Sequence, residues 1–519
     1  MQFRLRGLYF SDCFLLRTDS TFLPRSPALR WLLLALFALH LCLGSLMGLS
    51  VDEAHYALYA AHPALSYFDH PPLVGWAQMP LVALQVPDSA LRLVPGLLWL
   101  ATVLGVYRVT VQLHVESQSA GAAAAGLWAV LALALAPLLH ILGMGLLPDT
   151  LLMALTVALM HQTLTLTELS RPARPIDWLV LGVLLGLAGL SKYTAVLAAM
   201  AVAICLLAAH GPRLLRSPWL WLSALVAAIL IAPVILWNAQ NQWVSFAYQF
   251  QHGAGGAWQF PHVLRFLLLQ VVVYGPLLLW GGQGLRMVAR TPSRWLAAFF
   301  AIPFALLAYL SGGGTSLPHW TAPAWVALAP FAGMALAHAV QTRARKWVLA
   351  LVAVQALLCL ALPVLMATGG VPFFQAKAAT SAQAPNPFAD LHGWDQAGAR
   401  ARSLAAQHQL DSVSVQNWTL ASRLGWYARP MKVHVLEDRF DQFDLWAGDL
   451  PQGGNTLLVD WSEMAYVTPV GGNGFASCKL LDVLPVQRLG RPLSEFRFYA
   501  CNGWSADPKP RLQSEAGAP

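Results

Sequence analysis

Ionisable side chains are concentrated in the stretch "SVDEAHYALYAAHPALSYFDHPPLVG", which covers residues 50–75. Those of interest are Asp52, Glu53, His55, Asp69 and His70. The stretch follows an apolar run, residues 29–49, that is long enough to cross a bilayer. Ionisable groups at the mouth of a membrane span are costly and are therefore functional candidates. We predict that residues 50–87 form the first outer loop and that a carboxylate in it acts as a general base towards a hydroxyl.

Four other segments are predicted to bring polar groups to the same face of the membrane. They contribute Asp149, Lys192, His252 and His319. A lysine and histidines can hold a phosphate and offset its negative charge as it leaves. A site at bilayer depth suits a substrate carried by a lipid, so group transfer from a lipid phosphate fits these residue types. The same residue types also suit a proton-coupled transporter.

Structural explanations compete with these functional ones. Asp52 can be a helix cap, Asp149 can mark a helix start, and Lys192 can be an interfacial lysine whose amine reaches water. Either His252 or His319, taken alone, fits a hydrogen-bonded structural histidine.

Composition excludes a single water-soluble core. The chain of 519 residues is 57% hydrophobic and only 11% charged, with a mean hydropathy of +0.55, whereas soluble domains carry about 25% charged residues.

Recurring apolar runs predict an all-α polytopic membrane domain with about eleven transmembrane helices. The predicted spans are 28–49, 89–112, 121–141, 147–167, 176–191, 193–210, 217–237, 263–285, 294–311, 320–341 and 347–367. Residues 176–210 can also be one long broken helix.

Basic residues give the predicted orientation. Lysine and arginine occur in alternate loops, while the loops 50–87, 142–146, 238–262 and 312–319 contain none. This alternation places the N-terminus in the cytoplasm and those four loops outside, and it holds only if 176–210 crosses the membrane twice. The same rule accounts for the net charge of +8, so we predict no nucleic-acid partner.

Composition also divides the chain into domains. Residues 1–27 carry arginines but no signal-peptide cleavage site, and we predict a cytoplasmic leader. The membrane domain is predicted over 28–369. Residues 370–505 are more polar, with β-like runs "VSVQ", "KVHVL" and "TLLVDW" and a helix over 394–408, which predicts a small α/β domain on the outer face. Residues 506–519 are predicted to be disordered.

The cysteines do not indicate a metal or redox site. Cys42, Cys205 and Cys359 lie in apolar spans and are predicted to be packing residues. Cys478 and Cys501 lie in the outer domain and can pair if that compartment is oxidising. No CxxC spacing occurs.

Motifs in these segments resemble those of the C-type, polyprenyl-phosphate-dependent glycosyltransferases. "DEAHY" followed by "YFDHPPLVGW" resembles their first outer loop. "LLPDTLLM", "GLSKYTAVL" and "FAYQFQHGAGG" resemble their third outer motif, their lysine motif and their aromatic-histidine loop. "LPHWTAPAW", "GWDQAG", "LASRLGWY" and "DRFDQFDLWAG" resemble one bacterial branch. The resemblance covers almost all of residues 28–505. Within that group, the motifs more specifically resemble the bacterial relatives of protein O-mannosyltransferases and the lipid A aminoarabinose transferase.

This resemblance implies the C-type glycosyltransferase fold in a bacterial inner membrane, with the catalytic face and the C-terminal domain in the periplasm. It also implies that a hydroxyl of an envelope acceptor, which can be a glycolipid, a polysaccharide or a protein, attacks the anomeric carbon of a polyprenyl-phosphate sugar. The single displacement inverts the configuration, with Asp52 as general base and Glu53 as its partner.

The resemblance assigns roles to the remaining site residues. It assigns Lys192, His70 and His319 to the donor phosphate, Asp149, Tyr56 and Tyr67 to the substrate and acceptor, and Asp69 and His252 to a divalent metal ion. The two metal candidates alone are an incomplete ligand set, and no other cofactor is predicted. His70 stands where relatives often carry lysine, and histidine is mostly neutral near pH 7. The eleven predicted spans and the long tail also depart from the aminoarabinose transferase.

Two other functions stay open from the sequence. A transporter or flippase of lipid-linked sugars would place charges near mid-membrane and show paired broken helices, neither of which is clear. A non-catalytic envelope protein that binds glycans would tolerate Asp52→Asn. In the tail, four aromatic residues can either stack on sugars or form a core: Trp418, Trp426, Tyr427 and Trp446.

Overall fold

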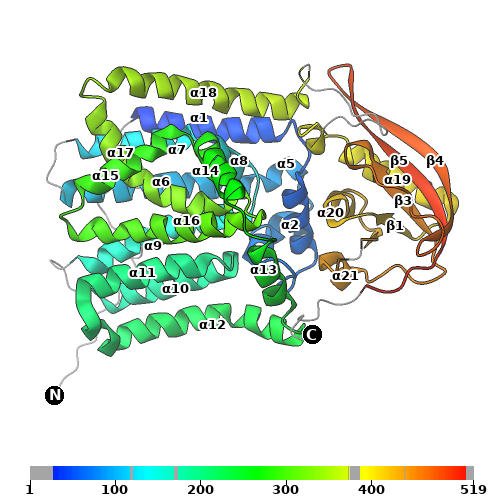
Figure 1. Ribbon diagram of the computed structural model, residues 1–519, viewed down its shortest axis with the longest axis horizontal. Helices are drawn as coiled ribbons and strands as arrows, with labels where there is room; N and C mark the ends of the chain where they lie inside the picture. Colours follow the sequence, from blue (N-terminus) through cyan, green and yellow to red (C-terminus); the bar gives the residue numbers. More distant parts are fainter. Residues whose placement is uncertain are drawn as a thin grey trace.

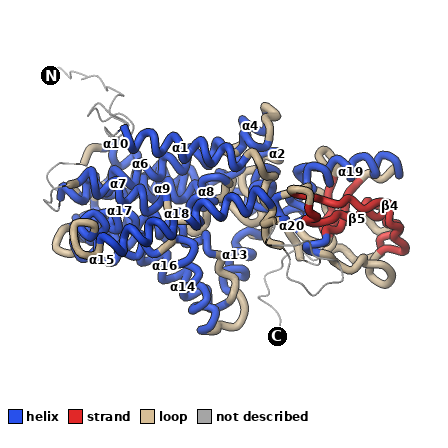
Figure 2. Tube along the Cα trace, turned by 90° about the horizontal axis from the view of Figure 1, so that it is seen from above, coloured by secondary structure: helices blue, strands red, loops and turns tan. Residues whose placement is uncertain are grey.

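A computed structural model describes residues 27–116, 121–168, 173–371, 373, 386–437 and 439–509. Residues 1–26 of the predicted leader and 510–519 of the predicted tail therefore lie outside the described residues. Apolar helices run side by side in a bundle, and a sheet with its own helices lies at one end of that bundle (Figures 1 and 2). The chain is therefore a multi-pass membrane protein of the predicted fold class, mostly helical with a small C-terminal sheet domain.

The bundle and its loops contain eighteen of the described α-helices. These are α1 (Pro27–Gly44), α2 (Val51–Ala61), α3 (Leu73–Trp76), α4 (Met79–Ala83), α5 (Asp88–Leu91), α6 (Leu93–Glu116), α7 (Ala122–Ala134), α8 (Pro137–Met144), α9 (Pro148–Thr167), α10 (Pro175–Ser191), α11 (Ala195–His210), α12 (Pro218–Gln240), α13 (Val244–Ala254), α14 (Phe260–Tyr274), α15 (Gly281–Met287), α16 (Ala298–Leu310), α17 (Ala322–Ala339) and α18 (Arg345–Thr368).

Within the described ranges, seven helices are long and apolar enough to cross a membrane, or nine if two bent pairs each form one span. Two shorter apolar helices, Leu29–Gly44 and Pro175–Ser191, add to these. Residues 176–210 form two separate helices, α10 and α11. The count of eleven spans stays a prediction.

Two predicted spans are not straight helices, which corrects the sequence interpretation. α7 and α8 meet at an angle of 77°, and α14 meets the segment Pro276–Met287 at 101°. A proline begins the second half of each pair, at Pro137 and Pro276. Proline lacks a backbone N–H and clashes with the preceding helical turn, so it breaks both spans.

Helix α17 lies at the centre of the bundle, and all its residues except His338 are buried. Small residues allow neighbouring helices to approach it closely. A side chain at Gly333, for example, would lie 2.5 Å from the carbonyl oxygen of Ala125 in α7. The main apolar core of the membrane part surrounds this helix.

The C-terminal domain is a mixed five-stranded sheet in the order β2-β1-β3-β5-β4, with three short helices. Its elements are α19 (Trp394–His408), β1 (Ser412–Val415), α20 (Trp418–Tyr427), β2 (Lys432–Val435), α21 (Gln442–Trp446), β3 (Thr456–Trp461), β4 (Phe475–Arg488) and β5 (Arg491–Trp504). Strand β1 is parallel to β2 and β3, and β5 is antiparallel to β3 and β4. A disulfide between Cys478 and Cys501 joins β4 to β5.

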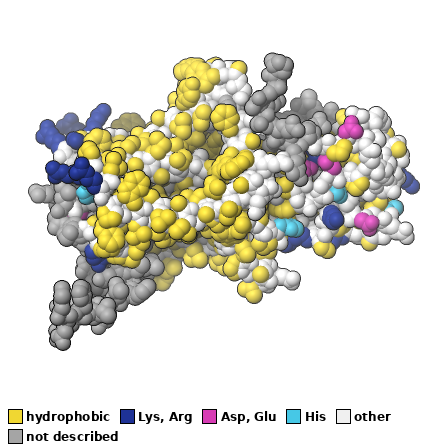
Figure 3. All heavy atoms as spheres, turned by 90° about the horizontal axis from the view of Figure 1, so that it is seen from below, with side chains coloured by type: hydrophobic (Ala, Val, Ile, Leu, Met, Phe, Trp, Pro, Cys, Tyr) yellow, Lys and Arg dark blue, Asp and Glu magenta, His cyan; other side chains and the backbone are white. Residues whose placement is uncertain are grey.

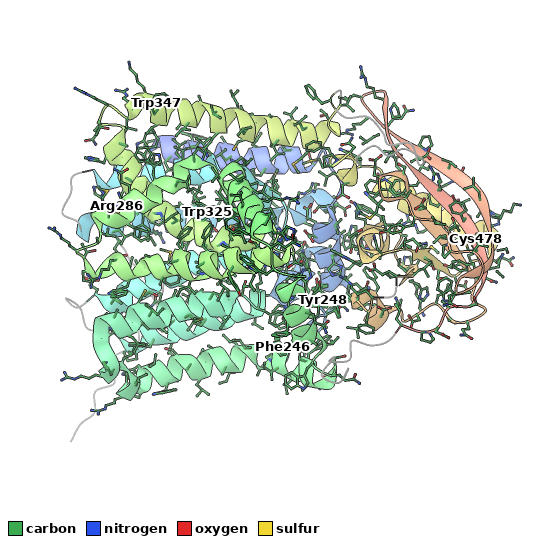
Figure 4. All side chains as sticks on the ribbon, in the orientation of Figure 1. Phe246, Tyr248, Arg286, Trp325, Trp347 and Cys478 are labelled. Atoms are coloured by element: carbon green, nitrogen blue, oxygen red, sulfur yellow. A yellow bond between two sulfur atoms is a disulfide. The ribbon has the colours of Figure 1, made fainter. Side chains whose placement is uncertain are left out.

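The kind of side chain on the surface changes along the length of the molecule. Hydrophobic side chains cover the middle of the bundle, while lysines and arginines gather at the end away from the sheet (Figure 3). Arg286 lies at that basic end, and Cys478 lies at the opposite end of the molecule (Figure 4). Outward apolar side chains such as Leu357 on α18 and Ile229 on α12 are more than half exposed, as a lipid-facing belt requires.

Candidate active site

A cavity of about 430 Å³ lies where the bundle meets the C-terminal domain. Its wall comes from α2 and the loop after it, the α10–α11 turn, α13, the segment before α17, and the C-terminal domain. Of the predicted site residues, seven line this cavity: Asp52, Tyr56, Asp69, His70, Lys192, His252 and His319. Segments far apart in the sequence therefore meet at one cavity.

Asp52 lies in the first turn of α2, but it is not the helix cap. Ser50 is the cap: its hydroxyl accepts a hydrogen bond from the Glu53 amide at 3.3 Å, and Glu53 accepts one from the Ser50 amide at 3.0 Å. Asp52 is half-buried and faces the cavity. Within the described part of the chain its carboxylate has no hydrogen bond or ion pair.

The surroundings of Asp52 favour its neutral form. Burial raises the pKa of Asp52, and the negative charges of Asp69 and Asp149 act in the same direction. His319 and His55 oppose this effect, yet the pKa stays above the ordinary value. A carboxylate with a raised pKa is a stronger base than an ordinary aspartate.

Glu53 does not line the cavity. Its two oxygens form a bidentate ion pair with Arg92, with Nε to Oε1 at 2.7 Å and Nη2 to Oε2 at 2.9 Å. Arg92 also donates hydrogen bonds to the carbonyls of Gly44, Met47 and Gly48. Glu53 thus ties α2 to the end of α1, and the structure does not bring it to the cavity as a partner for Asp52.

Asp69 and His70 lie on the loop after α2. Asp69 accepts a hydrogen bond from the Tyr59 hydroxyl, and its Oδ1 lies 3.6 Å from Nε2 of His55. Burial raises the pKa of Asp69, but His55 and the other partners outweigh it and hold the pKa below its usual range. Burial lowers the pKa of His70 to about 4, so this imidazole is neutral at pH 7.

Lys192 is buried and paired rather than an interfacial lysine. Its Nζ lies 2.7 Å from both carboxylate oxygens of Asp149, which follows Pro148 in the first turn of α9. His319 Nε2 lies 3.9 Å from the same carboxylate. The lysine Nζ also lies 5.7 Å from the Trp320 ring centroid. Asp149 therefore holds Lys192 in place and is not itself part of the cavity wall.

Helix α13 supplies an aromatic wall, and its Tyr248 lies at the junction with the C-terminal domain (Figure 4). The rings of Tyr248 and His252 stack at 5.2 Å, and His252 lies edge-on to Trp320 at 5.6 Å. Within the described residues, no group of three or more His, Cys, Asp or Glu side chains is arranged to hold a metal ion. Asp69 and His252 have no third ligand among them.

The two predicted tyrosines differ in position. Tyr56 lines the cavity. Tyr67 is fully buried and stacks on Tyr59 at 3.6 Å. Its hydroxyl donates to the Tyr59 carbonyl at 2.7 Å and accepts from the Ala64 amide at 3.1 Å, so it shapes the loop and does not face the substrate space.

The C-terminal domain contributes Trp418, Arg439, Asp441 and Gln442 to the cavity wall. Sequence reasoning considered Trp418 but missed the other three. They lie in the motif "DRFDQFDLWAG", but nothing local in it shows where the loop docks. Of the four tail aromatics considered, Trp418 lines the cavity, while Trp426 is buried in the core next to α2.

Asp441 and Gln442 fix this loop. Gln442 accepts a hydrogen bond from the Phe68 amide of the first outer loop at 2.8 Å. Asp441 caps α21 through Oδ1, which accepts from the Phe443 amide at 2.7 Å, while its Oδ2 is buried without a partner among the described residues. Burial and the charge of Asp444 raise the pKa of Asp441 to about 7.

Comparison with known proteins gives two findings. Residues 69–237 match a family model described as dolichyl-phosphate-mannose-protein mannosyltransferase. The fold is similar to two crystal structures of ArnT from Cupriavidus metallidurans, one in the apo state and one bound to undecaprenyl phosphate. Both matches have 17% sequence identity and a TM-score of 0.59, and both cover 93% of this chain. The match covers 100% of the ArnT chain in the apo structure and 99% of it in the undecaprenyl phosphate complex. No curated protein is similar enough in sequence to count as a match.

These findings confirm the resemblance to the C-type glycosyltransferases that the motifs indicate. The family match begins at Asp69 and extends through Lys192, and the shared fold extends over both the bundle and the C-terminal sheet domain.

Proposed function

We propose that this protein is a membrane glycosyltransferase that moves a sugar from a polyprenyl-phosphate donor to a hydroxyl of a cell-envelope acceptor. One observation carries the proposal. Asp52 faces the cavity with no partner among the described residues, whereas Asp69 and Asp149 are held by neighbouring side chains. A general base needs such a free carboxylate. The family match, and the fold shared with a protein bound to undecaprenyl phosphate, support the donor class.

In the proposed step, Asp52 accepts the proton of the acceptor hydroxyl while that oxygen forms a bond to the anomeric carbon. The bond between this carbon and the phosphate oxygen breaks, and polyprenyl phosphate leaves with the electron pair. A single displacement of this kind inverts the anomeric configuration. Lys192, oriented by Asp149, and the imidazoles of His70 and His319 lie along the cavity to receive the phosphate.

The proposed location is the bacterial inner membrane, with the N-terminus in the cytoplasm and the cavity in the periplasm. The basic end of the bundle supports this orientation. The Cys478–Cys501 disulfide on the opposite end also suits an oxidising compartment. We further propose 28–369 as the catalytic membrane domain and 370–505 as the periplasmic domain.

The test compares wild type and Asp52→Asn in lipid nanodiscs. Each protein is incubated with radiolabelled polyprenyl-phosphate sugars and an envelope extract. We expect release of polyprenyl phosphate and labelled product from wild type, and a loss of roughly 10²–10⁴-fold in the variant. Asp411→Asn is the matched control, because Asp411 is exposed and does not line the cavity.

Equal turnover by Asp52→Asn would remove Asp52 as the base. Binding of the donor by wild type without any transfer would instead favour a flippase or a glycan-binding protein.

A further inference from the structure

The bundle alone gives the cavity an excess of negative charge. Asp52 and Asp69 line it, and the one lysine in its wall, Lys192, has both oxygens of Asp149 at 2.7 Å. Three carboxylates thus face one ammonium group. A donor phosphate is an anion, and in a partly buried site it would be repelled by this arrangement. A second cation in the cavity wall would offset this repulsion.

Arg439 is the other permanent cation among the described residues that line the cavity. Its side chain is exposed, and it forms no ion pair within the described part of the chain. Its guanidinium carbon lies 5.6 Å from the Tyr248 ring centroid. Arg439 belongs to the loop between β2 and α21, so this charge comes from the C-terminal domain.

One aromatic wall connects this arginine to the lysine. The ring of Tyr248 stacks on His252, and His252 contacts Trp320 edge-on. The Nζ of Lys192 lies over the Trp320 ring at the other end. The wall therefore carries one cation from the C-terminal domain at one end and one from the bundle at the other.

The loop that carries Arg439 is anchored on both sides. Gln442 binds the Phe68 amide of the first outer loop. Lys509, near the end of the described chain, pairs with Asp444 and donates to the Val435 carbonyl at 2.6 Å. The backbone at Arg439 is thus held at the cavity. Its side chain hydrogen-bonds Tyr248, and the other N–H donors of the five on a guanidinium stay available.

We propose that Arg439 binds the phosphate of the lipid-linked donor, so that the C-terminal domain completes the donor site. This inference rests on the proposed function and deepens it. The planar guanidinium can donate two parallel hydrogen bonds to phosphate oxygens. It supplies the positive charge that Lys192, paired with Asp149, does not.

The test measures binding of a polyprenyl phosphate rather than turnover. Full-length protein in nanodiscs of zwitterionic lipid is titrated with a polyprenyl phosphate and, separately, with the neutral polyprenol. We expect Arg439→Gln to weaken binding of the phosphate by roughly tenfold or more and to leave polyprenol binding unchanged. Arg439→Lys should restore part of the affinity. The control is Arg491→Gln, an exposed arginine of the same domain outside the cavity wall.

The outcomes separate the two proposals. If wild type binds the phosphate in preference to polyprenol and Arg439→Gln binds it equally well, the role of Arg439 is overturned and the donor class stands. If wild type shows no preference for the phosphate, both proposals fail. A thermal unfolding midpoint that matches wild type verifies that Arg439→Gln is folded, and Arg439→Glu should weaken binding further.

Discussion

Carboxylates in and beside the cavity have the same chemistry but different partners, and the partners decide what each can do. Glu53 is paired with Arg92, and Asp149 is paired with Lys192. Asp52 has no such partner among the described residues. At the residue scale, the candidate base therefore differs from the other two carboxylates because it forms no ion pair among the described residues. This difference makes two predictions.

The first concerns pH. Asp52 must be ionised to accept a proton, and burial raises its pKa above the ordinary value of 3.8. We expect kcat/KM to rise with pH and its acid limb to lie above 3.8, since kcat/KM reports the pKa of the free enzyme. The measurement is kcat/KM over a pH series with a fixed donor. An acid limb at or below 3.8 would contradict the buried environment assigned to Asp52.

The second concerns Arg92, whose side chain is 4% exposed. Arg92→Leu leaves the Glu53 carboxylate buried without its cation, so we expect a loss of about 3–5 kcal/mol in the free energy of unfolding. Arg400→Leu is the control, because its ion pair with Asp482 is 40% and 30% exposed and is worth about 1 kcal/mol or less. Chemical unfolding in detergent measures both.

The same pair has a pH dependence with a defined sign. Burial raises the pKa of Glu53, but Arg92 outweighs it and the pKa lies below the ordinary value of 4.5. The stability that this ion pair contributes is therefore fully present above pH 4.5, the ordinary pKa of glutamate. It is lost as the pH falls through the lower pKa that Glu53 has in the folded protein. Equal losses for Arg92→Leu and Arg400→Leu would show that Glu53 is not held as a buried anion.

At the scale of elements, α2 is the connection between the two halves of the molecule. Tyr56 and Tyr59 pack into the core of the bundle, while Ala54, Ala57 and Leu58 pack into the core of the C-terminal domain. An amphipathic helix on a membrane surface would leave one face in water, but α2 is buried from Glu53 to Ala60. The position of Asp52 is therefore set by both cores.

Helix α3 fixes α2 from the side through a close backbone contact. A Cβ at Gly75 would lie 2.6 Å from the Cβ of Tyr59, so Gly75→Ala must push the two helices apart. We expect a loss of about 1–3 kcal/mol in stability and lower transferase activity, because Tyr59 holds Asp69. Gly282→Ala is the control, since nothing lies within 4 Å of its Cβ position. Similar stability and activity for both variants would contradict this contact.

At the scale of the whole molecule, charge and covalent chemistry differ between the two ends. The basic loops lie at one end, and the disulfide lies at the other (Figures 3 and 4). Between them lies the apolar belt. These features together support one orientation in the membrane.

Cysteine labelling tests that orientation. Val467 is 91% exposed in the C-terminal domain, and Arg286 is exposed at the basic end. With a membrane-impermeant maleimide added to the periplasmic side of intact cells, we expect Val467→Cys to be labelled and Arg286→Cys to be labelled only after lysis. The parent protein, with its free cysteines, gives the background. The reverse pattern would invert the proposed topology.

The sequence by itself determined the elements that local pattern controls. Apolar runs gave the membrane helices to within a few residues, and the helix predicted over 394–408 agrees with α19 (Trp394–His408). The three β-like runs are β1, β2 and β3. The hairpin of β4 and β5 was missed because register shifts, such as that between Leu480 and Asp482, interrupt its alternation, and because β4 is largely exposed at the edge of the sheet.

Only the tertiary structure decided which side chains meet. The motifs named Asp52, Lys192 and His319, because each lies at the end of a predicted span on one face. They could not show that Glu53 turns away to Arg92, or that Arg439 reaches the cavity from a separate domain. Hydropathy and periodicity depend on neighbours within a few positions, whereas these contacts join residues tens to hundreds of positions apart and exist only once both cores have packed around α2.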